Sequence, residues 1–212
     1  MSLRSSTFIP RFVNLKNGMR RSYVGGFSME VQGPTRAAEL DPSVRSILKL
    51  SAQDARESSY YYVNALGDAL PHAGRFVELH ASRTDKLGRR VPVVHQAWSN
   101  NDIRMTEDMI ESALAVADAI TPADSVIVPI RDPRRHRALF HEAGGCAMGH
   151  DPSTTVTDPA CRVRGVRGLY VADASVFPTS GDRHPTLTIL ALAARTARHI
   201  SESCSRSELR AA

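Results

Sequence analysis

Three stretches in the last third of the chain decide how it folds: His141-Glu-Ala-Gly-Gly-Cys-Ala-Met-Gly149, Leu169-Tyr-Val-Ala-Asp-Ala-Ser-Val-Phe-Pro-Thr-Ser-Gly181 and His184-Pro-Thr-Leu-Thr-Ile189. The first is a glycine-rich loop. The second opens with an apolar run, residues 169–172, which predicts a short buried strand with Asp173 at its C-terminal end, where open α/β sheets bind ligands. The third predicts a helix that runs to about residue 200, because proline is favoured at the first helical position.

The predicted final helix carries no charged side chain from Leu187 to Ala194, so we expect its start to be buried. Arg195, Arg198 and His199 follow near its other end, where cations interact favourably with the helix dipole. A buried helix start needs partners for its N–H groups, and side-chain capping is the ordinary solution. The alternative is a bound group with negative charge, which such an end stabilises by up to about 2 kcal/mol.

Two histidines are candidates for proton transfer, because imidazole gains and loses a proton near neutral pH. His141 begins the glycine-rich loop and His184 stands at the helix start, 43 residues further along the chain. Each of them alone is compatible with a hydrogen-bonded structural role, and their spacing in the sequence does not bring them together.

Taken together, the three stretches closely resemble the C-terminal segment of the GMC (glucose–methanol–choline) oxidoreductases, over about residues 137–203. Ile9-Pro-Arg-Phe-Val-Asn-Leu15 and Ser99-Asn-Asn-Asp-Ile-Arg-Met105 are similar to the sugar- or gluconate-dehydrogenase branch of that family. The resemblance implies an FAD-dependent oxidoreductase that oxidises a CH–OH group of an alcohol or sugar-type substrate. In this family, hydride passes from the alcohol carbon to flavin N5.

The resemblance also implies roles for particular residues. His141 is expected to be the base or the oxygen-orienting partner of the alcohol, and His184, at a position that holds His or Asn in the family, to share that role. The residues expected to contact the cofactor are Asp173, Ala174, Pro185, Thr186 and Leu187. The last three begin the helix whose positive end would face the N1/C2=O edge, where reduced flavin is negatively charged.

The implied fold class is α/β (α+β), a partial GMC fold. Residues 1–136 are expected to form an antiparallel-sheet portion of the substrate domain. Residues 137–203 are expected to form the strand–loop–helix segment of the FAD domain, which carries the catalytic histidines, and residues 204–212 to form a tail. Local patterns predict a glycine-interrupted strand over residues 23–32 and a hairpin with its turn over residues 76–98. They also predict a helix over residues 100–120, capped by Asn100 or Asn101, and a second short buried strand over residues 125–130.

No two of the 13 glycines lie two positions apart, so the G-x-G-x-x-G fingerprint that holds the FAD pyrophosphate is missing from this sequence. We therefore expect the N-terminal Rossmann half to be absent. Either the chain is a fragment or truncated reading frame, or a separate FAD-binding polypeptide supplies that half. Alone, the chain should bind FAD poorly and expose apolar surface on the face meant for the missing half.

Other classes of function fit the sequence less well. The possible zinc ligands are His141, Cys146, His150 and Cys161, but no C-x-x-C occurs and Gly145 stands where H-E-x-x-H needs its second histidine, so no metal is expected. Ser175 lacks the G-x-S-x-G elbow of a serine hydrolase. A catalytically silent remnant or binding module that keeps the fold remains as the alternative.

The composition narrows the setting. Apolar residues make up 42% and charged residues 23%, as in ordinary globular proteins. The net charge of +5 is scattered apart from residues 131–137, so no nucleic-acid partner is expected. The apolar run at residues 185–194 is too short to span a bilayer, and no secretory signal is visible. Three cysteines do not make a disulfide framework, which leaves the cytoplasm as the default location.

Overall fold

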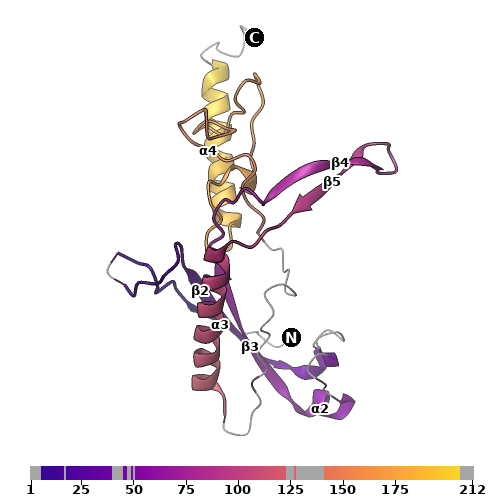
Figure 1. Ribbon diagram of the computed structural model, residues 1–212, viewed down its shortest axis with the longest axis vertical. Helices are drawn as coiled ribbons and strands as arrows, with labels where there is room; N and C mark the ends of the chain where they lie inside the picture. Colours follow the sequence, from indigo (N-terminus) through magenta and orange to yellow (C-terminus); the bar gives the residue numbers. More distant parts are fainter. Residues whose placement is uncertain are drawn as a thin grey trace. The chain divides into compact units, whose positions relative to one another are not determined.

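The computed structural model describes residues 6–16, 18–39, 45–46, 49, 51–122, 127 and 141–205. The chain divides into two compact units, and Figure 1 labels most of their helices and strands. The first unit comprises residues 1–67 and 101–137, and the second comprises residues 68–100 and 138–212. The strand predicted at 125–130 lies, apart from residue 127, outside the described residues.

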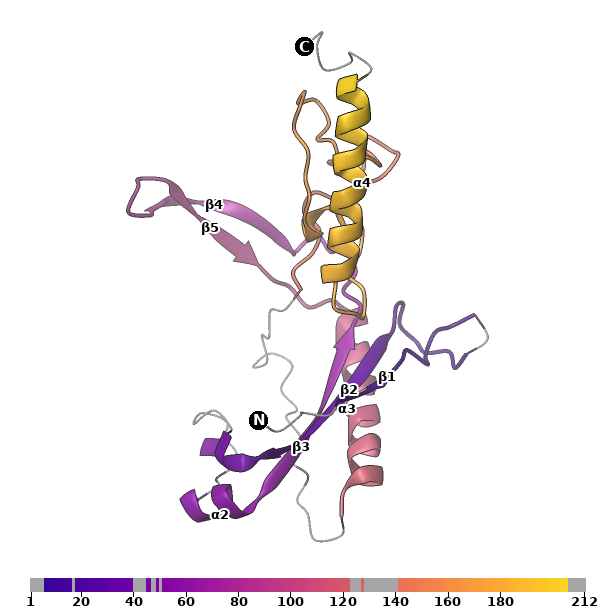
Figure 2. The same ribbon diagram turned by 180° about the vertical axis from the view of Figure 1, so that it is seen from behind.

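The first unit is built on a three-stranded antiparallel sheet in the order β1-β2-β3. The strands are β1 (Ser6–Ile9), β2 (Phe27–Arg36) and β3 (Ser59–Gly67), with the short helices η1 (Ala37–Glu39) and α2 (Ala52–Glu57) between β2 and β3. The long helix α3 (Asn100–Ile120) runs beside the sheet, as both ribbon views show (Figure 1, Figure 2).

The strand predicted over residues 23–32 begins later than expected, at Phe27. Gly25 has φ of 90°, in the left-handed region that a strand cannot use. The adjacent glycines Gly25 and Gly26 therefore precede the strand instead of interrupting it, and Tyr23 and Val24 belong to a loop.

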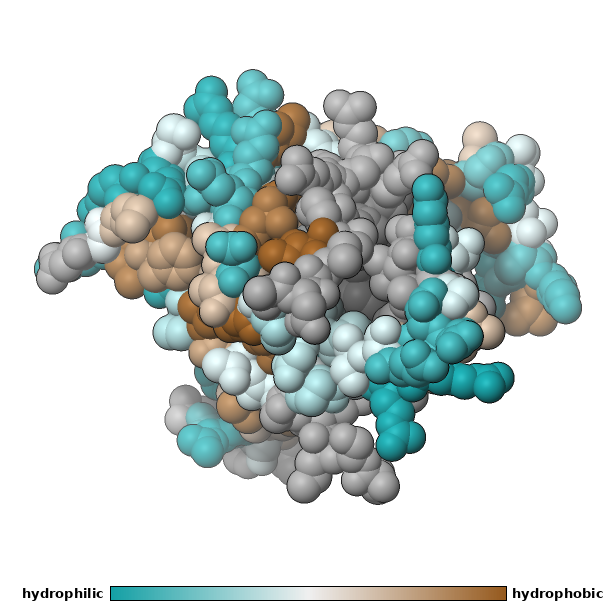
Figure 3. Space-filling view, turned by 90° about the horizontal axis from the view of Figure 1, so that it is seen from below, coloured by the Kyte–Doolittle hydropathy of each residue, from teal (hydrophilic) through white to brown (hydrophobic). Residues whose placement is uncertain are grey.

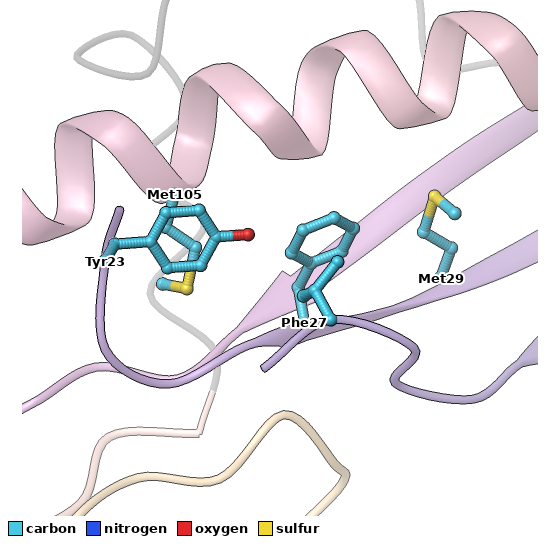
Figure 4. Close-up of a cluster of buried hydrophobic side chains, with 5 residues drawn as sticks. Tyr23, Phe27, Met29 and Met105 are labelled. Atoms are coloured by element: carbon cyan, nitrogen blue, oxygen red, sulfur yellow. The ribbon is translucent and has the colours of Figure 1, made fainter. Parts of the chain in front are cut away.

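This loop and the sheet bury one apolar cluster against α3: Val13, Tyr23, Phe27, Met29 and Met105. Figure 4 shows Tyr23, Phe27 and Met29 on the side of the sheet that faces the helix. Neither Asn100 nor Asn101 caps α3, because both lie inside the helix. The side-chain amide of Asn101 instead accepts a hydrogen bond from the backbone N–H of Val24 and donates one to its carbonyl. The predicted helix end at Ile120, before Thr121–Pro122, is confirmed.

The second unit contains the predicted hairpin, formed by β4 (Phe76–Thr84) and β5 (Arg90–His95). The carboxylate of Asp85 accepts hydrogen bonds from the backbone N–H groups of Leu87 and Arg89 and closes the turn. The unit also contains the short helix η2 (Ala174–Val176) and the long helix α4 (Thr186–Ser205). A second buried cluster lies between them: Cys161, Ala174, Val176 and Phe177, with Ile189 and Leu192 of α4 packed against it.

The strand predicted at residues 169–172 is not formed. Tyr170 makes a single bridge, to Arg162, and Leu169 is 48% exposed. Among the described residues no strand extends this bridge into a sheet, so Asp173 does not lie at a sheet edge. An apolar run forms a buried strand only where neighbouring strands pair with it, and the described residues around it contain no such strand.

The expectation that the start of α4 is buried is also wrong. Leu187 is 79% and Leu190 is 61% exposed, whereas Ile189 and Leu192 face the cluster. The first turns of the helix, from Leu187 to Ala194, carry no charged side chain on any side, but the described chain covers only one side of them. Other large apolar side chains are exposed as well, and Figure 3 shows hydrophobic residues reaching the surface among hydrophilic ones on the face drawn there. None of the described helices is both long and apolar enough to cross a bilayer.

Candidate active site

The structure brings the two predicted histidines into contact within the second unit. Nδ1 of His184 lies 3.1 Å from Nε2 of His141, and the rings are nearly perpendicular, at 85°, with centroids 4.8 Å apart. In this hydrogen bond one ring nitrogen is the N–H donor and the other is the acceptor, so at least one of the two rings must be neutral. His184 is exposed and His141 is half-buried, which leaves the pair open to a small molecule.

The glycine-rich loop places His141 in an unusual backbone conformation. Its φ is 68°, and Gly144 and Gly145 have φ of 85° and 90°. Positive φ is costly for a residue with a Cβ and nearly free for glycine, so the two glycines let the chain reverse beside the strained histidine. Strain of this kind persists only where the surrounding structure enforces it, and it concentrates at functional sites.

The same loop is bonded along its length to the segment around η2. The N–H groups of Gly144, Cys146 and Met148 donate to the carbonyls of Ala174, Ser175 and Val176, at 3.1, 2.9 and 2.8 Å. These bonds join the first two of the three decisive stretches. Ala174, predicted to contact the cofactor, is therefore tied to the loop that carries the first histidine.

Asp173 has a local role that the structure shows. It is the N-cap of η2, and its Oδ1 accepts a 2.8 Å hydrogen bond from the backbone N–H of Ser175. Hydrogen bonds from the side chain and then the backbone of Ser175 hold the pKa of Asp173 below its ordinary value. The carboxylate is thus charged at neutral pH and fixed at an exposed turn.

Replacing Asp173 with alanine is expected to lower the free energy of unfolding by about 0.5–1 kcal/mol at pH 7, because a cap is lost. A lowered folded-state pKa contributes stability that is present above the ordinary aspartate range, about pH 4, and is lost as the pH falls through the folded-state pKa. Urea unfolding at pH 7 and pH 3 should therefore show a smaller difference at pH 3. Asp173→Asn, which keeps a capping oxygen, is the matched control; an equal loss at both pH values would contradict the capping role of the charge.

The remaining predicted site residues, Pro185, Thr186 and Leu187, directly follow His184. The helix α4 begins at Thr186, so Pro185 precedes it by one residue instead of taking the predicted first helical position. The N–H of Ile189 donates to the carbonyl of Pro185 at 2.9 Å, which marks the first helical turn. The preceding N–H groups of a helix have no acceptor within it. Thr186 and Leu187 are exposed, so this end of the helix dipole is accessible beside the imidazole pair.

Arg195 has a positioning role that the sequence does not predict. The sequence indicates only that it is a cation favourable to the helix dipole. Its guanidinium donates to the carbonyl of Pro159 at 2.6 Å and lies 3.7 Å from Sγ of Cys161. It therefore ties α4 to the loop on which the buried cluster rests. The available signal was a single arginine that follows a long uncharged run. Among the described residues, no group of three His, Cys, Asp or Glu side chains is placed to hold a metal ion.

A family model described as GMC oxidoreductase matches residues 72–193, which is more than half of the chain. The chain therefore belongs to the GMC oxidoreductase family and represents its C-terminal part. This confirms the family resemblance of the three stretches, and the observed α+β structure with antiparallel sheets confirms the predicted partial fold.

Curated relatives show the same relationship. The chain is 42% identical over 60 residues to an alcohol dehydrogenase [acceptor] of Pseudomonas putida, which covers 28% of this chain and 10% of that protein. It is 26% identical over 145 residues to the gluconate 2-dehydrogenase flavoprotein of Pantoea cypripedii, covering 66% and 23%. It is 44% identical over 61 residues to the 6'''-hydroxyparomomycin C oxidase of Streptomyces lividus, covering 29% and 11%. The chain thus matches a minor part of the length of each relative.

Proposed function

We propose that this chain forms the histidine-bearing C-terminal part of an FAD-dependent oxidoreductase that oxidises a CH–OH group of an alcohol or sugar-type substrate. The observation that carries the proposal is the 3.1 Å contact between His141 and His184 at the open start of α4. It is supported by the family match and by relatives named as alcohol and gluconate dehydrogenases. FAD, when bound, supplies the hydride acceptor, flavin N5.

The residues present fit an isoalloxazine ring at the start of α4. Thr186 and Leu187 are exposed there, so their backbone N–H groups and the positive end of the helix dipole can face the negative N1/C2=O edge of a reduced flavin. The 79% exposed side chain of Leu187 leaves apolar surface for a ring to cover. The Asp173–Ala174 turn, bonded to the glycine-rich loop, is the second place where we propose contact with the cofactor.

In this proposal the imidazole pair accepts or positions the proton of the substrate hydroxyl group. His141 accepts the proton as the alcohol carbon loses hydride, or orients the alcohol oxygen, and His184 shares that role through the hydrogen bond between the rings. Because that bond requires one donor and one acceptor, the tautomers of the two rings are coupled to each other. The His141 backbone that carries this ring is in the left-handed conformation, with φ of 68°.

We further propose that the remaining FAD contacts, above all those to the pyrophosphate, come from polypeptide outside these 212 residues, either in a longer chain or in a separate partner. Residues 1–136, 137–203 and 204–212 would then act as substrate-domain portion, flavin-edge segment and tail. All three cysteines are free in the structure.

A flavin spectrum tests the function. The 212-residue chain purified alone is expected to be colourless. If the neighbouring reading frame encodes a G-x-G-x-x-G polypeptide, the two produced together are expected to be yellow, with absorbance near about 450 nm. Anaerobic addition of alcohols, sugars or sugar acids should bleach that absorbance as flavin is reduced. A yellow complex that none of these substrates bleaches would favour the alternative, a catalytically silent module that keeps the fold.

The exposed face of α4 gives a second test of the missing contacts. Leu187 and Leu190 lie three residues apart on one side of the helix, at 79% and 61% exposure. Replacing both with glutamate is expected to lower the self-association and hydrophobic-dye binding of the isolated chain, because the largest apolar side chains of this face are removed. Sedimentation velocity and dye fluorescence measure the change. Val24→Glu, at a 65% exposed position of the first unit, is the control and should leave both signals unchanged.

A further inference from the structure

We propose that the second unit carries a further site, separate from the histidine pair, that binds a phosphate-bearing small molecule. A pocket of about 460 Å³ lies beside the last turns of α4. Residues 162–168 form most of its lining, together with Pro152, Asp158, Tyr170 and Ser203. In both ribbon views the loop segment of this region runs alongside α4 (Figure 1, Figure 2).

The pocket is formed by a short reversal of the chain. Arg162 and Tyr170 face each other in an antiparallel bridge, and the N–H of Val163 donates to the carbonyl of Leu169 at 2.9 Å. The residues between them turn back through Gly165 and Gly168, with φ of 75° and 73°. This reversal brings three arginines, from residues 162–168, to the lining of one pocket.

Only part of the arginine charge is compensated within the lining. Nε of Arg162 lies 3.1 Å from Oδ2 of Asp158. Burial acts to raise the pKa of Asp158, but hydrogen bonds from the backbone N–H groups of Arg162 and Ala160 and the charge of Arg162 outweigh it, so the pKa lies below its ordinary value. Asp158 is therefore charged at neutral pH and balances one arginine.

The other two arginines keep their charge at the pocket. Arg164 donates hydrogen bonds to the carbonyls of Gly149 and His150, at 2.6 and 3.2 Å, which hold its guanidinium in place without neutralising its charge. The carboxylate of Asp151 interacts with this charge, but Asp151 is not one of the residues that line the pocket. Arg167 forms no hydrogen bond or ion pair with any residue that the structure describes. The C-terminal end of the α4 dipole lies nearby and carries about half a negative elementary charge. This is less than the charge of the two uncompensated arginines, so the pocket remains positive.

The lining suits a phosphate group on a small organic molecule. Guanidinium groups match phosphate oxygens with paired donors, and the volume lies within the range of small-molecule sites. Val163, Val166 and Tyr170 offer apolar surface for the organic part. The pocket includes Ser203, which lies about 26 Å along α4 from Thr186 at 1.5 Å per residue, so the pocket is not part of the histidine site.

Calorimetric titration of the full 212-residue chain tests this site, with sodium pyrophosphate and with ADP at low ionic strength. Arg167→Gln removes the arginine that has no partner among the described residues, and it is expected to weaken binding of both probes about tenfold or more, as loss of a charged hydrogen bond does. Arg20→Gln makes the same charge change at an exposed position of the first unit and should leave binding unchanged. Circular dichroism of the variants checks that each is folded.

The comparison of the two probes identifies the form of the ligand. Tighter binding of ADP would assign the pocket to an organic phosphate, and equal binding would assign it to the diphosphate group itself. Equal weakening by Arg167→Gln and Arg20→Gln would show only general charge attraction and would overturn the proposal. So would the absence of measurable binding of either probe by the unmodified chain.

Discussion

Replacing His141 with alanine is expected to lower turnover about 10²–10⁴-fold in an FAD-loaded enzyme that contains this chain, while flavin stays bound. In the proposed mechanism the His141 ring receives the hydroxyl proton or orients the oxygen that carries it, and its tautomer is also coupled to that of His184 across 3.1 Å. The contacts proposed to hold the flavin lie at the start of α4 and in the Asp173–Ala174 turn, so the substitution should spare them. Steady-state turnover and the flavin absorbance of the purified variant measure both effects.

Two further substitutions make this test specific. His150→Ala removes an exposed histidine nine residues further along the same segment and should leave turnover unchanged. His184→Asn keeps a hydrogen-bonding side chain, of the other type that the family resemblance admits at this position, and should cost less than His141→Ala. Full turnover of the His141→Ala enzyme would remove His141 from the chemistry, whatever the fate of the flavin.

Replacing Phe27 with alanine is expected to destabilise the first unit by about 3–5 kcal/mol, the largest loss of stability that we predict. The Phe27 side chain is completely buried and meets Phe12 edge to face, with centroids 5.5 Å apart. It also lies in the cluster that joins β2 to α3, so the cavity would open in the centre of that unit. Hydrogen exchange of the β2 and α3 amides measures the local free energy of opening.

Phe76 provides the matched control. It is 47% exposed, and its ring stacks on His95 at 4.2 Å. Phe76→Ala removes the same atoms from a pair that is only partly buried and is expected to cost about 1 kcal/mol. Similar exchange in β2 and α3 for Phe27→Ala and for the unmodified chain would contradict the assignment of this cluster as the core of the first unit.

Elements with strong local signals were predicted well. The alternating pattern and the Asp85-Lys-Leu-Gly88 turn specified the hairpin, and the spacing of apolar residues specified α3 up to the proline that ends it. Predictions that depended on burial were wrong at the strand around Tyr170 and at the start of α4. Both assumed neighbours that would cover apolar residues, and no local pattern states whether such neighbours are present.

The sequence by itself determined the family, the two candidate histidines and the helix that follows Pro185. Each of these depends on residue types, or on patterns among residues that are close along the chain. Only the tertiary structure decided that the histidine rings touch, that Arg195 ties α4 to the Cys161 loop, and that three arginines line one pocket. These contacts join residues far apart in the chain, or depend on how a loop reverses. Their distances follow from the packing of the whole unit, which no local pattern encodes.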